Sequence, residues 1–365
     1  MKLIDLIAGT RPNFMKIAPI IHNMNQAWGG EGKYKYRLIH TGQHYDHNMS
    51  DQFFNQLRIP KPDVNLQVGS GTQAEQTAGI MIGYEKVLQD KKSDLCIVVG
   101  DVTSTMACAV TAQKMQVPVA HVEGGIRSDD WSMPEEINRL LTDSITNWFF
   151  TTSEFANKNL IKSGVSQDRI FFVGNTMIDT LLANMDNIKK PKFWDEIHLK
   201  PSQYFVITMH RPSNVDSLDK LQSTLNVIAN NTQDIPLIFP VHPRTKKQLE
   251  DLDIEASNLK FVDPQGYLEF IYLIKHAKGV ITDSGGITEE ATVLGIPCLS
   301  LRENTERPET VSIGTNELVG QDHDEIISSL KKIINGNWKK GVIPENWDGK
   351  TAKRIVKTIP YLLNS

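Results

Sequence analysis

Short apolar runs alternate with longer amphipathic stretches along almost the whole chain, and the runs fall into two series. The predicted strands of the first series are Leu3–Ala8, Arg37–His40, Leu95–Val99, Val117–Val122, Trp148–Thr151 and Ile170–Val173. Those of the second series are Tyr204–Thr208, Leu237–Phe239, Leu259–Val262, Gly279–Thr282 and Pro297–Leu299. Predicted helices such as Asn13–Trp28, Thr72–Leu88 and Thr103–Met115 separate the strands. This alternation predicts an α/β fold whose mostly parallel sheets are covered on both faces.

The two halves of the chain resemble each other. In each half the first strand leads into an Arg-Pro pair, at Arg11 and at Arg211, and proline suits the first turn of a following helix. Later in each half a strand ends in an aspartate, Asp101 or Asp283. The pattern therefore predicts two similar Rossmann-like domains, each a doubly wound parallel sheet.

We expect these domains to cover residues 1–175 and 176–349, with the polar, proline-containing stretch 187–202 as the linker. In open parallel sheets, ligands bind beyond the carboxyl ends of the strands. Two such domains facing a cleft would place the informative residues directly after strands.

The composition is that of an ordinary globular protein, with 365 residues, 40% hydrophobic and 22% charged. This length exceeds what one hydrophobic core usually serves, which agrees with two domains. The net charge of −4 gives no general basic field, so we expect no nucleic-acid partner. A charged substrate would need local cations instead.

The three cysteines, Cys96, Cys108 and Cys298, are far apart and lie among apolar or small residues, which is typical of reduced core positions. The apolar runs have the length of strands rather than of membrane spans. The N-terminal run meets Asp5 at once, unlike a signal peptide. We therefore expect a cytoplasmic protein without a membrane partner.

A phosphate site is indicated where Asp283 ends a predicted strand and Ser284, Gly285 and Gly286 begin a helix. The free N–H groups of a helix start favour an anion, and glycines let it approach closely. An ordinary serine-capped helix would show the same pattern. The segment is neither a Walker loop nor a Gly-x-Gly-x-x-Gly loop, so a nicotinamide cofactor is disfavoured. A glutamate one to two turns further, Glu289 or Glu290, could accept hydrogen bonds from a ribose.

Candidate acid and base groups also follow strands. Asp101 and Glu123 end successive strands of the first series, and Glu135 and Glu136 open the next helix, with Arg139 one turn later. Carboxylates around one site can divide acid and base roles when their surroundings separate their pKa values. Each alone is as readily a helix cap, but three at successive strand ends favour catalysis.

Positively charged residues follow several predicted strands, and arginine suits phosphate through its fixed fork of donors. They are Arg11, Lys16, Arg127, Arg139, His210, Arg211, His242, Arg244, Arg302 and Arg307. The matching placement of His210 and His242 favours contacts with phosphate or sugar. His44 and His47 have no cysteine or acidic partner at a recognised spacing, so no metal site is expected.

Several motifs resemble a known family when taken together and in order. They are Gly9-Thr10-Arg11-Pro12 with Lys16, Thr41-Gly42-Gln43-His44, Gly100-Asp101, residues 121–127, residues 134–139, Gly174-Asn175-Thr176, His210-Arg211, residues 283–290 and Glu306-Arg307-Pro308-Glu309. This series, which runs from Gly9 to about Gly320, is similar to that of the non-hydrolysing UDP-N-acetylglucosamine 2-epimerases.

The resemblance implies a fold like the glycosyltransferase B type, with the active site in the interdomain cleft and a C-terminal helix, residues 350–365, packed back on the first domain. It implies an isomerase that interconverts UDP-N-acetylglucosamine and UDP-N-acetylmannosamine by eliminating UDP and adding it back. No NAD, other cofactor or metal is expected, and a homodimer is.

The resemblance also assigns roles. Asp101, Glu123 and Glu135 become the candidate acid and base groups, and His210 joins them among the catalytic residues. The expected substrate-binding residues are Arg11, Lys16, Arg139, Phe270, Ser284, Gly285, Gly286 and Glu290, with Phe270 on uracil and Glu290 on the ribose. A neighbouring site for activation by substrate would involve Gln43, Glu136, Arg211 and His242.

The chain departs from the family pattern at two places. Residues 123–127 read Glu-Gly-Gly-Ile-Arg where the family often has Glu-Ala-Gly-Leu-Arg, and residues 212–214 read Pro-Ser-Asn instead of Arg-Glu-Asn. Residues 41–50 also resemble relatives that act on other UDP-amino sugars, including a 2,3-diacetamido uronic acid. Such a 2-epimerase, a hydrolysing 2-epimerase, a retaining glycosyltransferase and a non-catalytic nucleotide-sugar sensor therefore remain alternatives.

Overall fold

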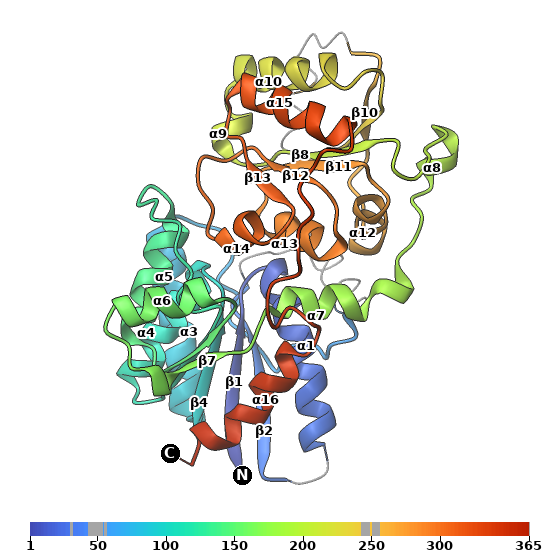
Figure 1. Ribbon diagram of the computed structural model, residues 1–365. Helices are drawn as coiled ribbons and strands as arrows, with labels where there is room; N and C mark the ends of the chain where they lie inside the picture. Colours follow the sequence, from blue (N-terminus) through green and yellow to red (C-terminus); the bar gives the residue numbers. More distant parts are fainter. Residues whose placement is uncertain (30–31, 43–53, 55–56, 242–248, 250–255, 365) are drawn as a thin grey trace. The chain divides into compact units, whose positions relative to one another are not determined.

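The structure is a computed structural model of the 365-residue chain, and it describes residues 1–364 except 30–31, 43–53, 55–56, 242–248 and 250–255. The chain forms two compact units (Figure 1). Unit 1 comprises Met1–Leu182 and Glu345–Ser365, and unit 2 comprises Ala183–Pro344. Each unit is a doubly wound α/β structure with its own parallel sheet, which confirms the predicted fold class.

Unit 1 is built on a seven-stranded sheet in the order β3-β2-β1-β4-β5-β6-β7. The strands are β1 (Lys2–Ala8), β2 (Tyr34–His40), β3 (Val64–Asn65), β4 (Leu95–Val99), β5 (Val119–Val122), β6 (Trp148–Thr151) and β7 (Ile170–Phe172). The helices are α1 (Arg11–Trp28), α3 (Gln73–Asp90), α4 (Thr103–Lys114), α5 (Pro134–Ile145), α6 (Glu154–Lys162), α7 (Thr176–Ala183) and α16 (Thr351–Leu362), with a 3-10 turn at Gln167–Arg169. In Figure 1, α3, α4 and α5 follow one another over one face, while α1 and α16 lie side by side.

The chain's last segment returns to unit 1 through specific contacts. Both carboxylate oxygens of Asp179, on α7, accept backbone N–H groups at the start of α16, from Thr351 at 3.1 Å and Ala352 at 2.7 Å. The indole Nε1 of the buried Trp347 donates to the carbonyl of Thr152 at 2.9 Å. The backbone N–H groups of a helix start need such acceptors, so Asp179 determines where α16 begins.

Unit 2 repeats the topology with six strands in the order β10-β9-β8-β11-β12-β13. The strands are β8 (Phe205–Thr208), β9 (Leu237–Pro240), β10 (Leu259–Val262), β11 (Gly279–Thr282), β12 (Cys298–Ser300) and β13 (Asn316–Leu318). The helices are α8 (Phe193–Glu196), α9 (Pro212–Val215), α10 (Leu218–Asn230), α12 (Tyr267–Lys275), α13 (Gly285–Leu294), α14 (Pro308–Ser312) and α15 (His323–Ile334), with a 3-10 turn at Met185–Asn187.

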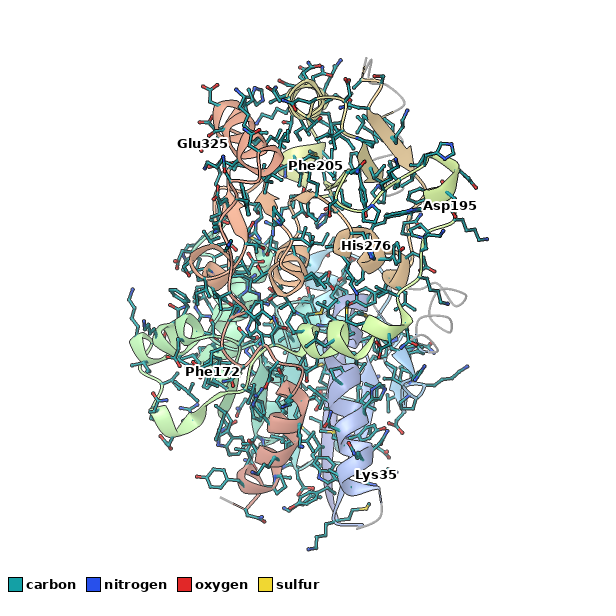
Figure 2. All side chains as sticks on the ribbon, turned by 45° about the vertical axis from the view of Figure 1, so that its right-hand side comes forward. Lys35, Phe172, Asp195, Phe205, His276 and Glu325 are labelled. Atoms are coloured by element: carbon teal, nitrogen blue, oxygen red, sulfur yellow. The ribbon has the colours of Figure 1, made fainter. Side chains whose placement is uncertain are left out.

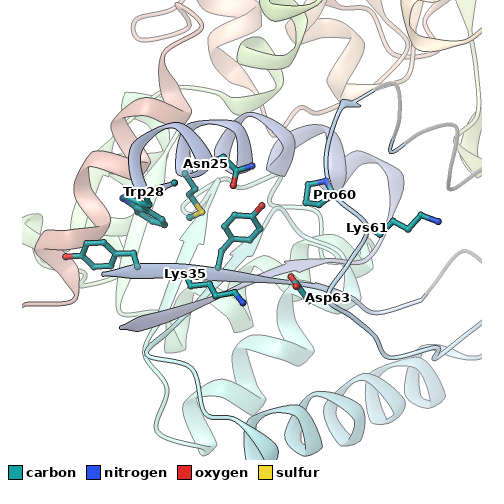
Figure 3. A pocket seen from close by; sticks show the side chains of 10 residues that line it. Asn25, Trp28, Lys35, Pro60, Lys61 and Asp63 are labelled. Atoms are coloured by element: carbon teal, nitrogen blue, oxygen red, sulfur yellow. The ribbon is translucent and has the colours of Figure 1, made fainter. Parts of the chain in front are cut away.

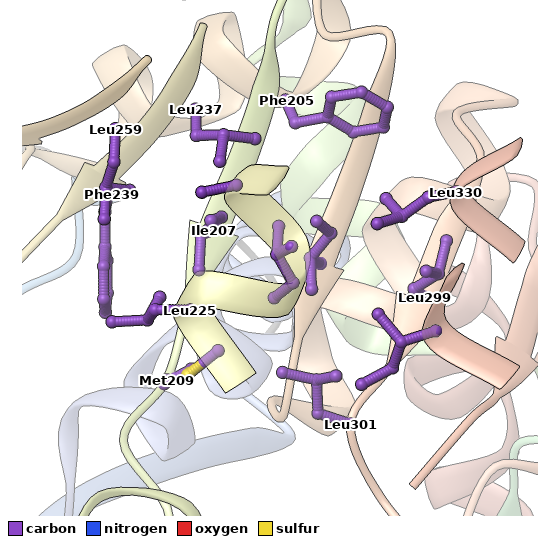
Figure 4. Packing of buried hydrophobic residues seen from close by; sticks show 14 of the residues in the cluster. Phe205, Ile207, Met209, Leu225, Leu237, Phe239, Leu259, Leu299, Leu301 and Leu330 are labelled. Carbon is purple, nitrogen blue, oxygen red and sulfur yellow. The ribbon is translucent and has the colours of Figure 1, made fainter. Parts of the chain in front are cut away.

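The core of unit 2 follows from the two-residue period of its strands. Phe205 and Ile207 point to the same face of β8, where Leu225 of α10 and Leu330 of α15 pack against them (Figure 4). Glu325, on the same helix as Leu330, is exposed at the outer side of α15, whereas Phe205 lies inside (Figure 2). The apolar stripe of each helix therefore covers the sheet.

Residues 187–202, which the sequence suggested as the linker, belong to unit 2. Trp194 in α8 is 6% exposed and makes edge-to-face contacts with Tyr204 and Tyr272, at ring-centroid distances of 5.3 Å each. Burying an aromatic side chain of this size fixes the segment on the unit, since such rings contribute strongly to packing. The division between the units falls at Leu182 and Ala183 instead, at the end of α7.

Candidate active site

The candidate residues of unit 1 follow strands that are neighbours in its sheet. β1 pairs with β4, and β4 pairs with β5, all in parallel, so their carboxyl ends meet at one edge. Arg11 opens α1 after β1, Asp101 comes after β4, and Glu123 comes after β5. The strand order reverses between β1 and β4, which is where doubly wound sheets bind ligands.

The turn between β1 and α1 is held by Asn13. Its Oδ1 accepts the backbone N–H groups of Gly9 and Thr10, each at 3.1 Å, and its Nδ2 donates to the carbonyl of Val99 at 3.0 Å. The buried amide therefore ties the end of β1 to the end of β4. This fixes the first turn of α1, from which the candidate cations Arg11 and Lys16 extend.

Lys16 and Glu123 form an ion pair in which Nζ lies 2.8 Å from Oε2. The two side chains are 13% and 2% exposed, so little water screens the pair. Glu123 also has a φ of 71°, a left-handed conformation that is uncommon outside glycine, at a cost of roughly 1–3 kcal/mol. Its N–H donates to the carbonyl of Phe150 at 2.9 Å, which helps to hold this conformation. The fold thus directs a buried, charged carboxylate toward a lysine.

Asp101 is held by Arg139 of α5. Nε and Nη2 of the arginine donate to Oδ2 of Asp101 at 3.0 and 2.6 Å, and Asn138 donates to the Asp101 carbonyl at 2.9 Å. The Asp101 side chain is 30% exposed, whereas that of Arg139 is only 3% exposed. The carboxylate is therefore accessible to solvent, and the arginine that holds it is buried.

Glu136 orients that arginine. Its Oε2 accepts Nη1 of Arg139 at 2.5 Å and the N–H and hydroxyl of Ser128 at 3.0 Å each, while Oε1 accepts the N–H of Asp129 at 3.1 Å. Glu136 is 1% exposed. In this structure it therefore connects α5 to the loop after β5.

A buried histidine, His121, which begins the motif 121–127 but received no role from the sequence, joins the same strand ends. Nδ1 of His121 lies 2.7 Å from Asp143 and Nε2 lies 2.7 Å from the carbonyl of Gly100, so both ring nitrogens face oxygen atoms. Asp143 also accepts Gly125 N–H at 3.0 Å and Arg127 at 2.6 Å. Burial acts to raise the pKa of Asp143, but the hydrogen bond from His121 and the charges of His121 and Arg127 hold it below its ordinary value.

Two further candidates lie where a substrate can reach them. Arg11 is exposed at the first position of α1. Glu135 is half-buried at the start of α5, where the helix dipole favours a carboxylate. The structure therefore places Asp101, Glu123, Arg11, Lys16 and Arg139 around neighbouring strand ends, with Glu135 on the adjoining helix.

In unit 2 the buried Asp283 organises the equivalent switch point between β8 and β11. Its carboxylate accepts the N–H groups of His210 and Arg211, each at 2.9 Å, and Nδ2 of Asn214 at 3.0 Å. It also contacts Nδ1 of His210 at 2.7 Å. Burial works to raise the pKa of Asp283, but His210, the Arg211 N–H and Asn214 together hold it below its ordinary value. The His210 side chain remains 53% exposed, while its contact with Asp283 fixes its position.

The start of α13 offers N–H groups to an anion. Ser284 is the N-cap, but within the described residues no side chain caps the helix, and its first turn holds no acidic residue. In the part of the chain that the structure describes, nothing outside α13 lies within 4 Å of the place where a Cβ of Gly286 would be, whereas the side chains of Glu306 and Arg302 lie beside Gly285. The start of α13 therefore has backbone N–H groups that no described side chain caps, and the phosphate site stays a prediction.

Glu290 lies one turn further along α13. Burial first, and then the negative charge of Glu289, raise the pKa of Glu290 to about 8, although the hydrogen bond from Tyr267 opposes the shift. The Tyr267 hydroxyl donates to Oε1 at 3.0 Å. Tyr267 and Phe270 lie on α12, which packs beside α13, so Phe270 comes from the helix expected to contact the base.

Some expectations have no counterpart in the described part of the chain. Gln43 and His242 lie outside the described residues. Among the residues that are described, no three His, Cys, Asp or Glu side chains are placed to hold a metal ion, and no helix has the length and hydropathy to cross a membrane. The three cysteines are buried and free, as predicted.

A cavity of about 310 Å³ in unit 1 lies away from these residues (Figure 3). It is lined by Trp28 at the end of α1, Tyr34 and Tyr36 at the start of β2, and Lys61 and Asp63 before β3. The amino ends of the strands, rather than the carboxyl ends, border it. It therefore contains none of the candidate groups.

The candidate groups are carboxylates paired with cations in unit 1 and, in unit 2, a helix start with backbone N–H groups that no side chain of the described residues caps. Such groups suit proton transfer on a substrate that carries phosphate. Two doubly wound units in one chain are the architecture of the glycosyltransferase B type.

Comparisons with known proteins agree with this class. The family model described as UDP-N-acetylglucosamine 2-epimerase matches residues 26–360. The UDP-N-acetylglucosamine 2-epimerase of Methanocaldococcus jannaschii is 41% identical over 99% of both chains. The UDP-2,3-diacetamido-2,3-dideoxy-D-glucuronate 2-epimerase of Pseudomonas aeruginosa is 38% identical over 91% of this chain and 92% of that protein.

Solved structures show the same relationship. The crystal structure of the Methanocaldococcus jannaschii UDP-GlcNAc 2-epimerase in complex with UDP-GlcNAc and UDP is similar with a TM-score of 0.86 and 41% identity, over 99% of this chain and 100% of that one. The chain therefore belongs to the UDP-N-acetylglucosamine 2-epimerase family, and it is an epimerase.

Because the pKa of Glu290 is raised in the folded protein, the unfolding free energy should depend on pH. A carboxyl group whose folded-state pKa is raised stabilises the fold fully below its ordinary pKa of 4.5 and loses that contribution as pH rises through about 8. Glu290→Gln keeps the hydrogen bond with Tyr267 but cannot ionise. Between pH 5 and pH 8.5 the wild type should lose up to roughly 4 kcal/mol of unfolding free energy relative to the variant.

Urea unfolding of both proteins at several pH values checks this. Glu325→Gln, on the exposed side of α15, is the matched control and should follow the wild type. If the unfolding free energies of the wild type and Glu290→Gln changed with pH in the same way, Glu290 would ionise as an ordinary carboxyl group. That result would contradict the prediction.

Proposed function

We propose that this epimerase interconverts UDP-N-acetylglucosamine and UDP-N-acetylmannosamine without hydrolysing them. The observation that carries the proposal is the pair of strand-end carboxylates in unit 1, Glu123 on Lys16 and Asp101 on Arg139. Epimerisation at C2 needs one group to remove a proton and another to return it to the opposite face. Two carboxylates, each held by its own cation, could serve as these two groups.

The C2 proton of an N-acetyl sugar is only weakly acidic, so direct removal is slow. In the proposed route a carboxylate takes this proton while the C1–O bond to UDP breaks, and the bonding electrons leave with the phosphate oxygen. The products are a 2-acetamidoglucal and UDP. UDP then adds back to C1 while an acid group returns a proton to the other face of C2. The net change is isomerisation, with no oxidation step, so the route needs no nicotinamide.

Charge on the reacting atoms determines which residues assist. C1 becomes positive as its bond to UDP breaks, as in glycoside cleavage, and the leaving diphosphate gains negative charge. We assign Asp101, Glu123 and Glu135 to proton transfer, and Arg11, Lys16, Arg139 and His210 to the sugar and diphosphate. Preorganised cations of this kind stabilise the transition state more than the ground state.

In unit 2 we assign Ser284, Gly285 and Gly286 to the diphosphate through the open start of α13. Glu290 is assigned to the ribose and Phe270 to the uracil. The raised pKa of Glu290 supports the ribose role, since a carboxyl group that keeps its proton near neutral pH both donates and accepts hydrogen bonds.

A second substrate is favoured by one specific observation. The Pseudomonas aeruginosa relative, 38% identical, is named as an epimerase of UDP-2,3-diacetamido-2,3-dideoxy-D-glucuronate. The sugar substituents at C3 and C6 separate the two substrates. Both proposals use the same C2 chemistry, so incubation with each UDP-sugar and analysis of the products decides between them. Free N-acetylmannosamine and UDP in proportion to turnover would instead indicate hydrolysis.

Asp101→Asn tests the assignment of the acid and base groups. The amide can still accept a hydrogen bond from Arg139 but cannot exchange a proton, so kcat should fall by about 10²–10⁴-fold. The affinity for UDP, measured by isothermal titration calorimetry, should stay unchanged.

The control is Asp129→Asn, at an exposed position whose backbone φ of 57° suits asparagine. It should keep wild-type turnover. Full activity of Asp101→Asn would remove Asp101 from the proton-transfer groups, and loss of UDP binding would make its role structural.

We also propose that the chain forms a homodimer through α5. The helix is inverted: its buried residues are Glu136, Asn138, Arg139, Thr142 and Asp143, whereas Ile137 and Leu141 are 42% and 46% exposed. The buried polar face of α5 belongs to the candidate site, and Ile137 and Leu141 remain exposed outside the unit's own core. A second copy would present the same patch, as two-fold symmetric interfaces require.

Ile137→Glu together with Leu141→Glu should therefore yield monomers, because two charges would be buried at the interface. Light scattering coupled to size-exclusion chromatography measures this. Val342→Glu, at a 66% exposed position in unit 2, should leave the dimer intact. A dimer that survives the double substitution would place the interface elsewhere.

A further inference from the structure

A buried arginine lies beside the open start of α13. Arg302 follows β12, whose neighbour in the sheet is β11, and Leu301 N–H donates to the carbonyl of Thr282 at 2.8 Å. This register puts Arg302 next to the turn that leads into Gly285. A Cβ on Gly285 would lie 3.5 Å from Nη1 of Arg302, so the guanidinium reaches the first helical residue.

The guanidinium is only partly satisfied. Nη2 of Arg302 lies 2.5 Å from Oε2 of Glu306, but Nε and Nη1 have no hydrogen-bond partner among the residues that the structure describes. The Arg302 side chain is 3% exposed. Buried donors without partners cost about 1–3 kcal/mol or more each, and most for charged groups. An arginine left in this state fits an anion that arrives from outside the chain.

Glu306 occupies the place that such an anion would approach. A Cβ on Gly285 would lie only 2.6 Å from Oε1 of Glu306, so the carboxylate packs directly against the helix start. Its side chain is 12% exposed and therefore nearer to solvent than the arginine. The Glu306 carboxylate is negatively charged, like a phosphate, and it lies beside the backbone N–H groups at the start of α13.

We propose that Arg302 is a diphosphate-binding residue and that Glu306 is an internal competitor, which holds Arg302 until the diphosphate of the nucleotide replaces it. The proposal rests on the function proposed above, in which unit 2 binds UDP. The diphosphate brings the acceptors that Arg302 lacks, and the amides of α13 and the guanidinium then share one anion. Exchange of one anion for another keeps the arginine paired in both states, which permits release of UDP-sugar after each turnover.

Opposite effects of the two side chains on UDP affinity test the proposal. Calorimetry of Arg302→Met should show UDP bound about 10–100-fold more weakly, the range for losing a charged hydrogen bond. Glu306→Gln removes the competing charge and should bind UDP several-fold more tightly. Uridine, which lacks the diphosphate, should bind all variants as it binds the wild type.

Further variants separate binding from folding. Arg302→Lys keeps the charge without the fork of donors and should fall between Arg302→Met and the wild type. The control is the exposed pair Lys332 and Glu317, 3.5 Å apart in the same unit, whose Met and Gln variants should bind UDP normally.

Equal losses for UDP and uridine in Arg302→Met and Arg302→Lys would contradict the proposal, since damage to the fold affects both ligands. Weaker UDP binding by Glu306→Gln would contradict it as well, because it would make Glu306 a supporting group rather than a competitor. These outcomes depend on affinity and not on turnover, so they remain distinct from a failure of the epimerase proposal, in which UDP binds but no sugar is isomerised.

Discussion

The ion pair between Lys16 and Glu123 is the contact on which the candidate site of unit 1 depends. A carboxylate that is 2% exposed stays charged only where an opposite charge replaces the water it has lost. Lys16 can do so because Asn13 fixes the turn before it, and Glu123 because its strained backbone aims it at the lysine. Removal of either partner would leave a buried charge unpaired, which is the costly case for such pairs.

Other carboxylates near the strand ends are also paired with basic side chains. Asp101 is paired with Arg139, Asp143 with His121 and Arg127, and Asp283 with His210. In unit 2 the pairing also shapes the backbone, since Asp283 accepts the N–H groups of the turn after β8. Glu290 is the exception: among the described residues it is hydrogen-bonded to a tyrosine and forms no ion pair, and burial raises its pKa. The units thus differ in chemistry: the strand-end carboxylates of unit 1 face cations, whereas unit 2 combines the Asp283–His210 pair with a helix start and a carboxyl group of raised pKa at Glu290.

Much of the fold could be predicted from the sequence because buried parallel strands read as short apolar runs. β4, β6, β10 and β11 begin and end at the predicted residues. β3 and β13 were not predicted, since Val64–Asn65 and Asn316–Leu318 are too short to form an apolar run. The stretch 187–202 looked like a linker by its polar residues and prolines, but Trp194 anchors it to unit 2 through contacts distant in sequence.

The sequence predicts the candidate residues that follow strands better than it predicts the side chains that hold them in place. Asp101, Glu123 and His210 follow strands, and the position after a strand is visible in the sequence. Asp143 reads as an ordinary acidic residue of a helix, and Glu136 was expected at a site for activation by substrate; the structure buries both because α5 turns its polar face inward. Arg302 could be recognised as a cation after a strand, but its unsatisfied donors appear only once Gly285 and Glu306 are placed beside it.

In the proposed reaction a proton leaves C2 and a proton returns to the other face while UDP is eliminated and re-added. The most direct measurement is proton NMR of UDP-N-acetylglucosamine incubated with the protein in deuterium oxide, without added cofactor. We expect UDP-N-acetylmannosamine that carries deuterium at C2, with no accumulation of free N-acetylmannosamine. Epimerised product that retains its original hydrogen at C2 would contradict proton exchange with a carboxylate, and release of free sugar with UDP would contradict the non-hydrolysing route.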